Sequence, residues 1–222
     1  MGASMAKGCE GEEAGGTRLQ ELILKVRNQI SDSMEVKRAL LEGDHAKTIA
    51  EIALLIINSY RSGGKVIFLG NGGSAADAQH LACELVGKFQ AERSALPAIA
   101  LSVNTSVLTA IGNDYGFERV FARQIEAWAG PEDVVVGIST SGNSPNVLKA
   151  MEAAKRIGAK TVGFTGRSGG KLVESVDLCL RIPSDSTPRI QEGHITAGHV
   201  ICSLVESALF GEDTQRRKEA NG

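Results

Sequence analysis

The chain has 222 residues, of which 42% are hydrophobic and 23% charged, and this fits a globular domain large enough to bury a core. Its 24 basic and 26 acidic residues give a formal net charge of −2, and only 4% of residues are aromatic, which argues against a general nucleic-acid binder. The sequence shows no secretory signal and no apolar run of membrane-spanning length, so we expect a cytoplasmic protein without a membrane partner.

The first 62 residues divide into a leader and two predicted helices. Residues 1–16 are rich in Gly, Ala and Glu and lack periodic apolar positions, so we expect a disordered leader. From residue 17 the apolar residues take helical spacing, and a second helix over 46–62 ends at a Gly-Gly pair. The helices of the 17–62 segment have apolar faces to bury, which favours a role in subunit contacts.

Strand and helix patterns then alternate over residues 63–210. Short apolar runs predict strands at 66–69, 98–101, 134–138, 161–165 and 178–182. Helical patterns lie at 74–89, 106–111, 117–129, 144–157, 171–175 and 188–209. This predicts an α/β fold, a doubly wound five-stranded parallel sheet with helices on both faces and ligands beyond the carboxyl ends of its strands. The polar residues 211–222 are expected to form a frayed tail.

The cysteines of the chain predict no disulfide. Cys9, Cys83, Cys179 and Cys202 are far apart and form no CxxC pair. We expect buried free thiols in a reducing compartment.

A glycine-rich turn, residues 70–74, follows the first strand and opens a helix. Free amides and the positive dipole end of a helix suit a phosphate. The glycine spacing matches neither the dinucleotide fingerprint nor a Walker A loop, so a purely structural turn stays open. His80 and Glu84 lie four residues apart on one face of this helix, where they could move protons or bind a metal.

A serine-rich turn follows the third strand. Ser139, Thr140, Ser141 and Ser144, with free amides, can surround the oxygens of a phosphate monoester without a lysine. Ser144 also fits a helix N-cap followed by Pro145, which alone accounts for that serine. The other three hydroxyls favour a phosphate site, and hence chemistry on a small phosphorylated molecule.

Two further turns carry weaker signals. Asn113 and Asp114 follow a short predicted helix, where they either form an Asx turn or present polar groups to substrate hydroxyls. The glycines of residues 165–170 suit a structural turn, and no role is assigned to them.

The last helix carries Gln191, His194 and His199. Gln191 and His199 are eight residues apart and share a face approximately, whereas His194 either joins them or lies in the core. With His80 and Glu84, Gln191 and His199 could supply four ligands to a divalent metal, and zinc suits the imidazoles and the carboxylate. The same groups could instead act as a general base and a general acid.

These motifs resemble the sugar isomerase (SIS) family and, within it, the bacterial phosphoheptose isomerases. The resemblance covers about residues 17–210 and is most specific at residues 70–74, 77–80, 112–114, 139–144 and 189–194. It implies an aldose–ketose isomerase that converts D-sedoheptulose 7-phosphate into D-glycero-D-manno-heptose 7-phosphate through an enediol, in heptose biosynthesis for lipopolysaccharide or related glycans. It also implies a homotetramer with sites between subunits.

The resemblance further implies roles for individual residues. Glu84 and His199 match the family's base and acid, and the positions that hold one zinc per subunit in metal-bound members are His80, Glu84, Gln191 and His199. The positions that match substrate contacts are Asn71, Gly72, Gly73, Ser74, Glu84, Asn113, Asp114, Ser139, Thr140, Ser141, Ser144 and Gln191.

Two alternatives without catalysis come from the same family. One relative binds the replication initiator and lacks the glutamate and histidine at the positions of Glu84 and His199. Another group of SIS modules senses sugar phosphates within transcription regulators. Both Glu84 and His199 are present here and no DNA-binding domain is evident, so the sequence favours the enzyme.

Overall fold

The computed structural model describes residues 10–220 and the side chains of residues 18–211. Helix α1 (Glu10–Leu41) begins upstream of the expected boundary at residue 17, so residues 10–16 of the predicted leader are helical. Helix α8 (Thr187–Ala220) likewise continues through most of the expected frayed tail. The remainder of the predicted leader, residues 1–9, lies outside the described residues.

Five strands form one parallel sheet, as the alternating pattern predicts. They are β1 (Val66–Gly70), β2 (Ala98–Ala100), β3 (Val134–Ile138), β4 (Lys160–Thr165) and β5 (Leu178–Arg181), in the spatial order β2-β1-β3-β4-β5. After β1 the chain forms β2 at one edge of the sheet, and then β3, β4 and β5 follow in order from the other side of β1 to the opposite edge. The turns after β1 and β3 therefore meet at the switch point of the sheet, where open α/β folds bind ligands.

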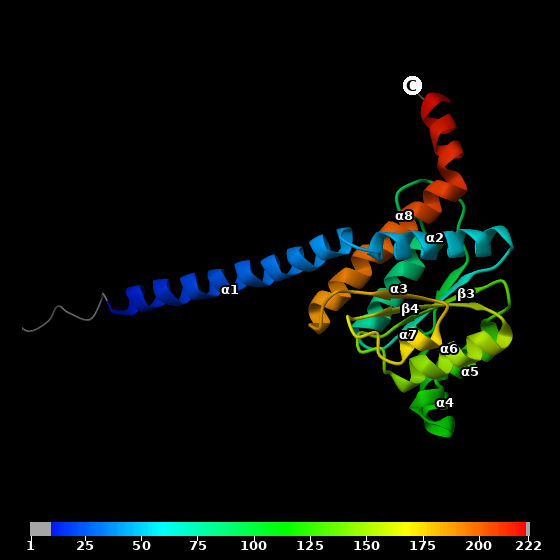
Figure 1. Cartoon of the computed structure of the whole chain (residues 1–222), viewed down its shortest axis with the longest axis horizontal. Helices are drawn as coiled ribbons and strands as arrows, with labels where there is room; N and C mark the ends of the chain where they lie inside the picture. The colour runs from blue at the N-terminus through cyan, green and yellow to red at the C-terminus, as the bar shows by residue number, and fades with distance from the viewer. Residues whose placement is uncertain (1–9, 221–222) are drawn as a thin grey trace, which may run out of the picture.

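The helices cover both faces of the sheet (Figure 1). Helices α2 (His45–Arg61), α3 (Gly73–Val86) and α8 pack on one face. The other face carries α4 (Thr105–Tyr115), the 3-10 turn η1 (Phe117–Arg119), α5 (Ala122–Trp128), α6 (Pro145–Ile157) and α7 (Leu172–Ser175). The helix expected over 117–129 is divided into η1 and α5, with the buried Val120 and Phe121 between them.

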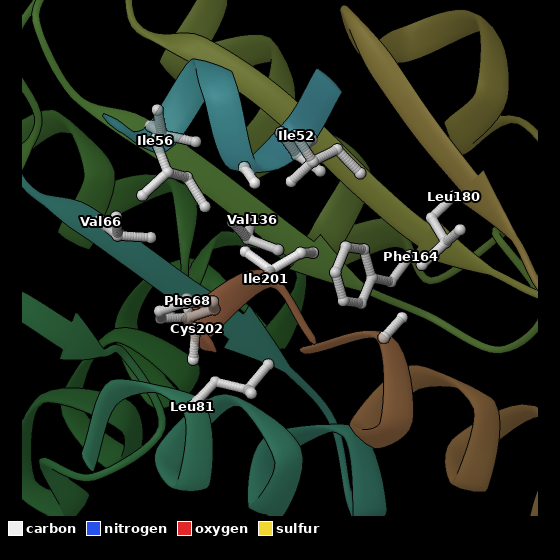
Figure 2. Close-up of a cluster of buried hydrophobic side chains, with 14 of the residues drawn as sticks. Ile52, Ile56, Val66, Phe68, Leu81, Val136, Phe164, Leu180, Ile201 and Cys202 are labelled. Carbon is white, nitrogen blue, oxygen red and sulfur yellow. The ribbon is translucent and has the colours of Figure 1, made fainter. Parts of the chain in front are cut away.

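Alternating strand residues build two cores. Phe68, Val136 and Phe164 point toward α2, α3 and α8, where they meet side chains such as Leu81 and Ile201 (Figure 2). Their neighbours along the strands belong to the core beneath α5 and α6. Burial on both faces is why these strands read as continuous apolar runs.

Helix α1 extends away from the sheet (Figure 1) and leaves its apolar side chains open to solvent in the single chain. Leu19, Leu22, Val26, Ile30 and Met34 are each more than half exposed. Contiguous exposed apolar surface of this kind marks an interaction site.

Three cysteines lie among the described side chains, and all are free thiols. Cys202 is buried and Cys179 partly buried, but Cys83 is exposed, so the expectation of burial is wrong there because that position of α3 faces outward. Cys9 lies outside the described residues. In the described part of the chain, no helix combines the length and apolar character required to cross a membrane.

Candidate active site

Three side chains from α3 and α8 converge at one point. His80 Nε2 lies 2.9 Å from His199 Nε2 and 3.3 Å from Glu84 Oε1. One ligand atom from each of the three residues lies within 4.8 Å of the others. His80 is exposed, whereas Glu84 and His199 are partly buried, so the cluster is accessible from solvent.

Close packing of α3 against α8 brings these residues together. A Cβ on Gly198 would lie 2.5 Å from Leu81 Cδ2, and a Cβ on Gly73 would lie 2.3 Å from Gln191 Nε2. Gly198 therefore requires glycine for the helices to approach this closely, because Leu81 is buried, whereas a Cβ at Gly73 would displace the end of the Gln191 side chain. Because His80 and Glu84 are four residues apart on α3, their side chains lie on the same face of the helix, toward His199.

The donor set fits a divalent cation. Two imidazole nitrogens and one carboxylate oxygen converge, and two ring nitrogens 2.9 Å apart need a shared proton or a cation between them. Gln191, the fourth predicted ligand, is partly buried with its amide packed against Gly73 at the start of α3. Its role as a ligand stays a prediction.

A carboxylate that the sequence analysis did not single out lies one turn before His80. Burial raises the pKa of Asp77 to about 6, and the nearby His80 opposes that shift. Its Oδ2 atom is buried without a hydrogen-bond partner. Asp77 therefore changes protonation state near neutral pH at the edge of the cluster.

The glycine turn and the serine turn lie side by side at the switch point. Asn71 and Asn146 exchange two amide hydrogen bonds of 2.9 and 2.8 Å, which tie the turn after β1 to the start of α6. Gly72 has a φ of +53° at the N-cap of α3, and Gly72 and Gly73 are both exposed. Ser74 is buried within this turn, and its contact with substrate stays a prediction.

The serine turn carries the four predicted hydroxyls, but Ser139 is buried, and contact of these hydroxyls with a phosphate stays a prediction. Ser144 is the N-cap residue of α6, but its hydroxyl makes no capping hydrogen bond and lies 2.9 Å from Ser139 Oγ instead. Capping therefore does not account for this serine. Thr140 and Ser141 line a cavity of about 180 Å³ together with Arg167.

The third turn, residues 165–170, packs its backbone closely against the serine turn. A Cβ on Gly142 would lie 2.0 Å from Gly169 O, and one on Gly170 would lie 2.4 Å from Ser141 O. The glycines thus let this turn pack against the serine turn.

Two predicted pocket residues lie elsewhere in the single chain. Asn113 and Asp114 belong to the last turn of α4 rather than to a turn after it, and the Asn113 amide donates to Asp114 Oδ1 at 2.8 Å. Helix α4 packs on the opposite face of the sheet from α3 and α8. Their proposed contact with substrate stays a prediction.

His194 lies in the core and not with the cluster. Its side chain is fully buried, Nε2 lies 3.1 Å from Thr165 O, and Nδ1 has no partner. Burial lowers the pKa of His194 to about 4, although the hydrogen bond with Thr165 opposes this shift. His194 is therefore neutral at physiological pH and plays a structural part.

Comparisons with known proteins identify one family. The SIS domain model matches residues 30–166. A phosphoheptose isomerase from a Roseiflexus species is 57% identical over 84% of this chain and 94% of its own length. Another from Rhodospirillum rubrum is 59% identical over 75% and 89%. The solved structure of a phosphoheptose isomerase from Neisseria gonorrhoeae superposes with a TM-score of 0.79 at 41% identity, covering 84% of this chain and 99% of that one.

Proposed function

The chain belongs to the SIS family, and we infer that it is a phosphoheptose isomerase that converts D-sedoheptulose 7-phosphate into D-glycero-D-manno-heptose 7-phosphate. The observation that carries this function is the convergence of Glu84 and His199 beside the switch point of the sheet, in a chain 57% identical to such an enzyme. The relatives fix the substrate class, and the cluster supplies groups that can move its protons.

The reaction moves a carbonyl from C2 to C1 through an enediol. A base takes a proton from C1 and returns it to C2. An acid donates a proton to the oxygen on C2 as the enediol forms, and the oxygen on C1 loses a proton as the aldose forms. We assign the carbon-bound proton to the Glu84 carboxylate and the oxygen protons to the His199 imidazole.

We propose that the phosphate binds at the two turns of the switch point. The amides of residues 72–74 begin a helix there, and the hydroxyls of Ser139, Thr140, Ser141 and Ser144 lie on the neighbouring turn. A phosphate bound at these turns directs the sugar chain along α3 toward Glu84 and His199.

We also propose one zinc per subunit, held by His80, Glu84, Gln191 and His199. Imidazole and carboxylate ligands suit zinc, and three of these residues already converge. When bound, the ion would stabilise negative charge on a substrate oxygen.

We propose a homotetramer with sites between subunits. The exposed apolar side chains of α1 require a partner, and Asn113 and Asp114 face away from the α3–α8 cluster in their own chain. A second copy could bring its α4 to that cluster. The free thiols support a reducing compartment, and we propose the cytoplasm, with the product serving lipopolysaccharide or related glycans.

Incubation of the purified protein with D-sedoheptulose 7-phosphate tests the activity directly. We expect the aldose product in chromatography with mass detection, and a lower rate after treatment with a chelator. A folded, metal-supplemented protein that forms no product would contradict the enzyme and favour a binding function.

A further inference from the structure

A buried carboxylate on α8 lies outside the proposed catalytic cluster, and both of its oxygens accept hydrogen bonds. The Glu206 side chain is 6% exposed and accepts hydrogen bonds from the backbone amides of Phe89, Gln90 and Ala91 at 3.0, 2.9 and 2.7 Å. It also accepts one from Arg93 Nε at 3.1 Å. One carboxylate therefore fixes the segment that follows α3.

Arg93 continues this network to the end of α3. Its side chain is 1% exposed, and its guanidinium donates to the carbonyls of Glu84 and Leu85 at 2.8 Å each. The last carbonyls of a helix have no partner within the helix, and a cation is favourable at that end. Arg93 thus holds the helical turn that carries the Glu84 side chain.

The network also reaches His199. The Phe89 ring lies with its centroid 5.6 Å from that of His199, so the three amide hydrogen bonds to Glu206 set the distance of this ring from the imidazole. Glu206 follows His199 by seven residues, two turns along the same face of α8. Within this ion pair, Arg93 therefore contacts the backbone of Glu84, and Glu206 holds the backbone of Phe89, whose ring lies beside His199.

We propose that Arg93 and Glu206 are positioning residues of the isomerase site, which hold the Glu84 turn of α3 and the Phe89 ring at fixed distances from His199. Burial of an ion pair is weak evidence for stability, because desolvation offsets the attraction. Its contacts here end on the backbone carbonyl of Glu84 and on the backbone amide of Phe89, whose ring lies against His199. The proposal rests on the proposed function for its kinetic effect, but its geometric part does not.

Two conservative variants test the kinetic effect. Glu206→Gln keeps the shape but turns one end of the side chain into a donor that faces backbone donors, and Arg93→Lys keeps the charge but loses the fork that spans several carbonyls. We expect kcat to fall about 10- to 100-fold in each, the range for residues that orient reacting groups through others. KM for D-sedoheptulose 7-phosphate should stay close to wild type, because the phosphate turns are untouched.

The chain offers a matched control at the amino ends of the central strands β1 and β3. The Asp133 carboxylate is also buried, accepts from the amides of Lys65 and Gly130 at 2.9 and 2.7 Å, and pairs with Lys65 Nζ at 2.6 Å. It lies where β1 and β3 begin, whereas the site lies beyond their carboxyl ends. Asp133→Asn should lower Tm and leave kcat unchanged. If Glu206→Gln behaves in the same way, its role is only structural and the proposal is wrong.

A spectroscopic readout separates this proposal from the proposed function. In protein with ¹³C-labelled histidine, the Phe89 ring shifts the His199 resonance, and we expect that resonance to move in Arg93→Lys and Glu206→Gln but not in Asp133→Asn. If wild-type protein forms no product, the proposed function fails while this measurement still applies. A His199 resonance unchanged in the two variants would overturn the positioning role.

A milder variant covers the case in which Glu206→Gln does not fold. Phe89→Leu removes the ring and leaves the three backbone amides bound to Glu206. We expect kcat to fall with Tm near that of wild type. A wild-type kcat in Phe89→Leu would overturn the part of the proposal that concerns His199.

Discussion

The Nε2 atoms of His80 and His199 lie 2.9 Å apart, although 119 positions separate the two residues in the sequence. Glu84 Oε1 lies 3.3 Å from the same His80 nitrogen. This contact joins α3 to α8 at the place where a proton or a cation must lie between the rings.

Replacing Glu84 with Gln should abolish turnover and keep substrate binding. The amide retains the shape and the hydrogen bonds but cannot take a proton from carbon, so we expect kcat to fall by about 100- to 10,000-fold. Product formation measures kcat, and calorimetric titration with D-sedoheptulose 7-phosphate measures binding. Glu174→Gln, at an exposed position of α7, is the control and should match wild type. A Glu84→Gln enzyme with wild-type kcat would exclude Glu84 as the base.

Replacing either histidine of the cluster with Ala should remove the proposed zinc. His80 and His199 each supply one of the convergent ligand atoms, and a site that has lost an imidazole holds the ion much more weakly. We expect the wild type to retain about one zinc per chain after desalting and both variants to lose it, as measured by elemental analysis. His45→Ala, at the start of α2, should retain the metal. Equal metal content in all four proteins would place the ion elsewhere.

Adding one methyl group at Gly198 should separate the two helices. A Cβ there would lie 2.5 Å from Leu81 Cδ2, and Leu81 is buried and cannot move away. We expect Gly198→Ala to cost about 1–3 kcal/mol in the free energy of unfolding and to lower kcat, because the methyl forces His199 away from His80.

The same helix provides the control for that substitution. Gly211 has open space around its Cβ position, so Gly211→Ala should raise Tm slightly through helix propensity and leave kcat unchanged. Thermal unfolding and product formation measure both effects. If Gly198→Ala is as stable and active as Gly211→Ala, close packing of α3 on α8 does not set the site.

The buried His194 should make stability depend on pH. Its pKa is about 4 in the folded chain against an ordinary value of 6.5. Between these values the unfolded chain binds a proton that the folded chain does not, so the free energy of unfolding decreases as pH falls from 6.5 to 4, by up to about 3 kcal/mol. Above pH 6.5 His194 is neutral in both the folded and the unfolded chain, so this loss of stability is absent.

His194→Gln should remove this dependence while a donor to Thr165 O remains available. Urea unfolding at constant protein concentration over pH 4–7 measures the difference between variant and wild type. Asp77 acts in the opposite direction in the same range, since a raised pKa loses stability as pH rises toward 6, and it cancels in that difference. Parallel curves for the two proteins would contradict the role of His194.

Local patterns were sufficient to predict the sheet and its two turns. Apolar runs set the five strands, and glycines and serines after β1 and β3 set the turns, because strand identity and helix starts depend on neighbours in sequence. Residue types alone suggested that His80 and His199 could share a metal site, and the family resemblance supported it, but the packing of α3 on α8 that joins them has no local signal.

The residues that the sequence did not reveal are polar groups buried by tertiary packing. No sequence pattern assigned a role to Arg93, Glu206 or Asn146, and the side chains of all three are buried. Their burial depends on contacts over 113 and 75 positions, which no window of sequence contains. Conversely, Asn113 and Asp114 were expected after a helix but lie within it, because α4 continues to Tyr115.

Charged residues on the apolar side of α1 should break the proposed homotetramer. Leu22 and Ile30 are 51% and 56% exposed in the single chain, so Glu at either position costs the isolated subunit little but places a charge in the interface. We expect Leu22→Glu/Ile30→Glu to give smaller species by light scattering and to lose kcat, because the proposed site needs a neighbouring α4. Lys25→Glu, at an exposed polar position of the same helix, controls for added acidic charge and should stay tetrameric. A tetramer that survives the double substitution would show that α1 does not form the interface.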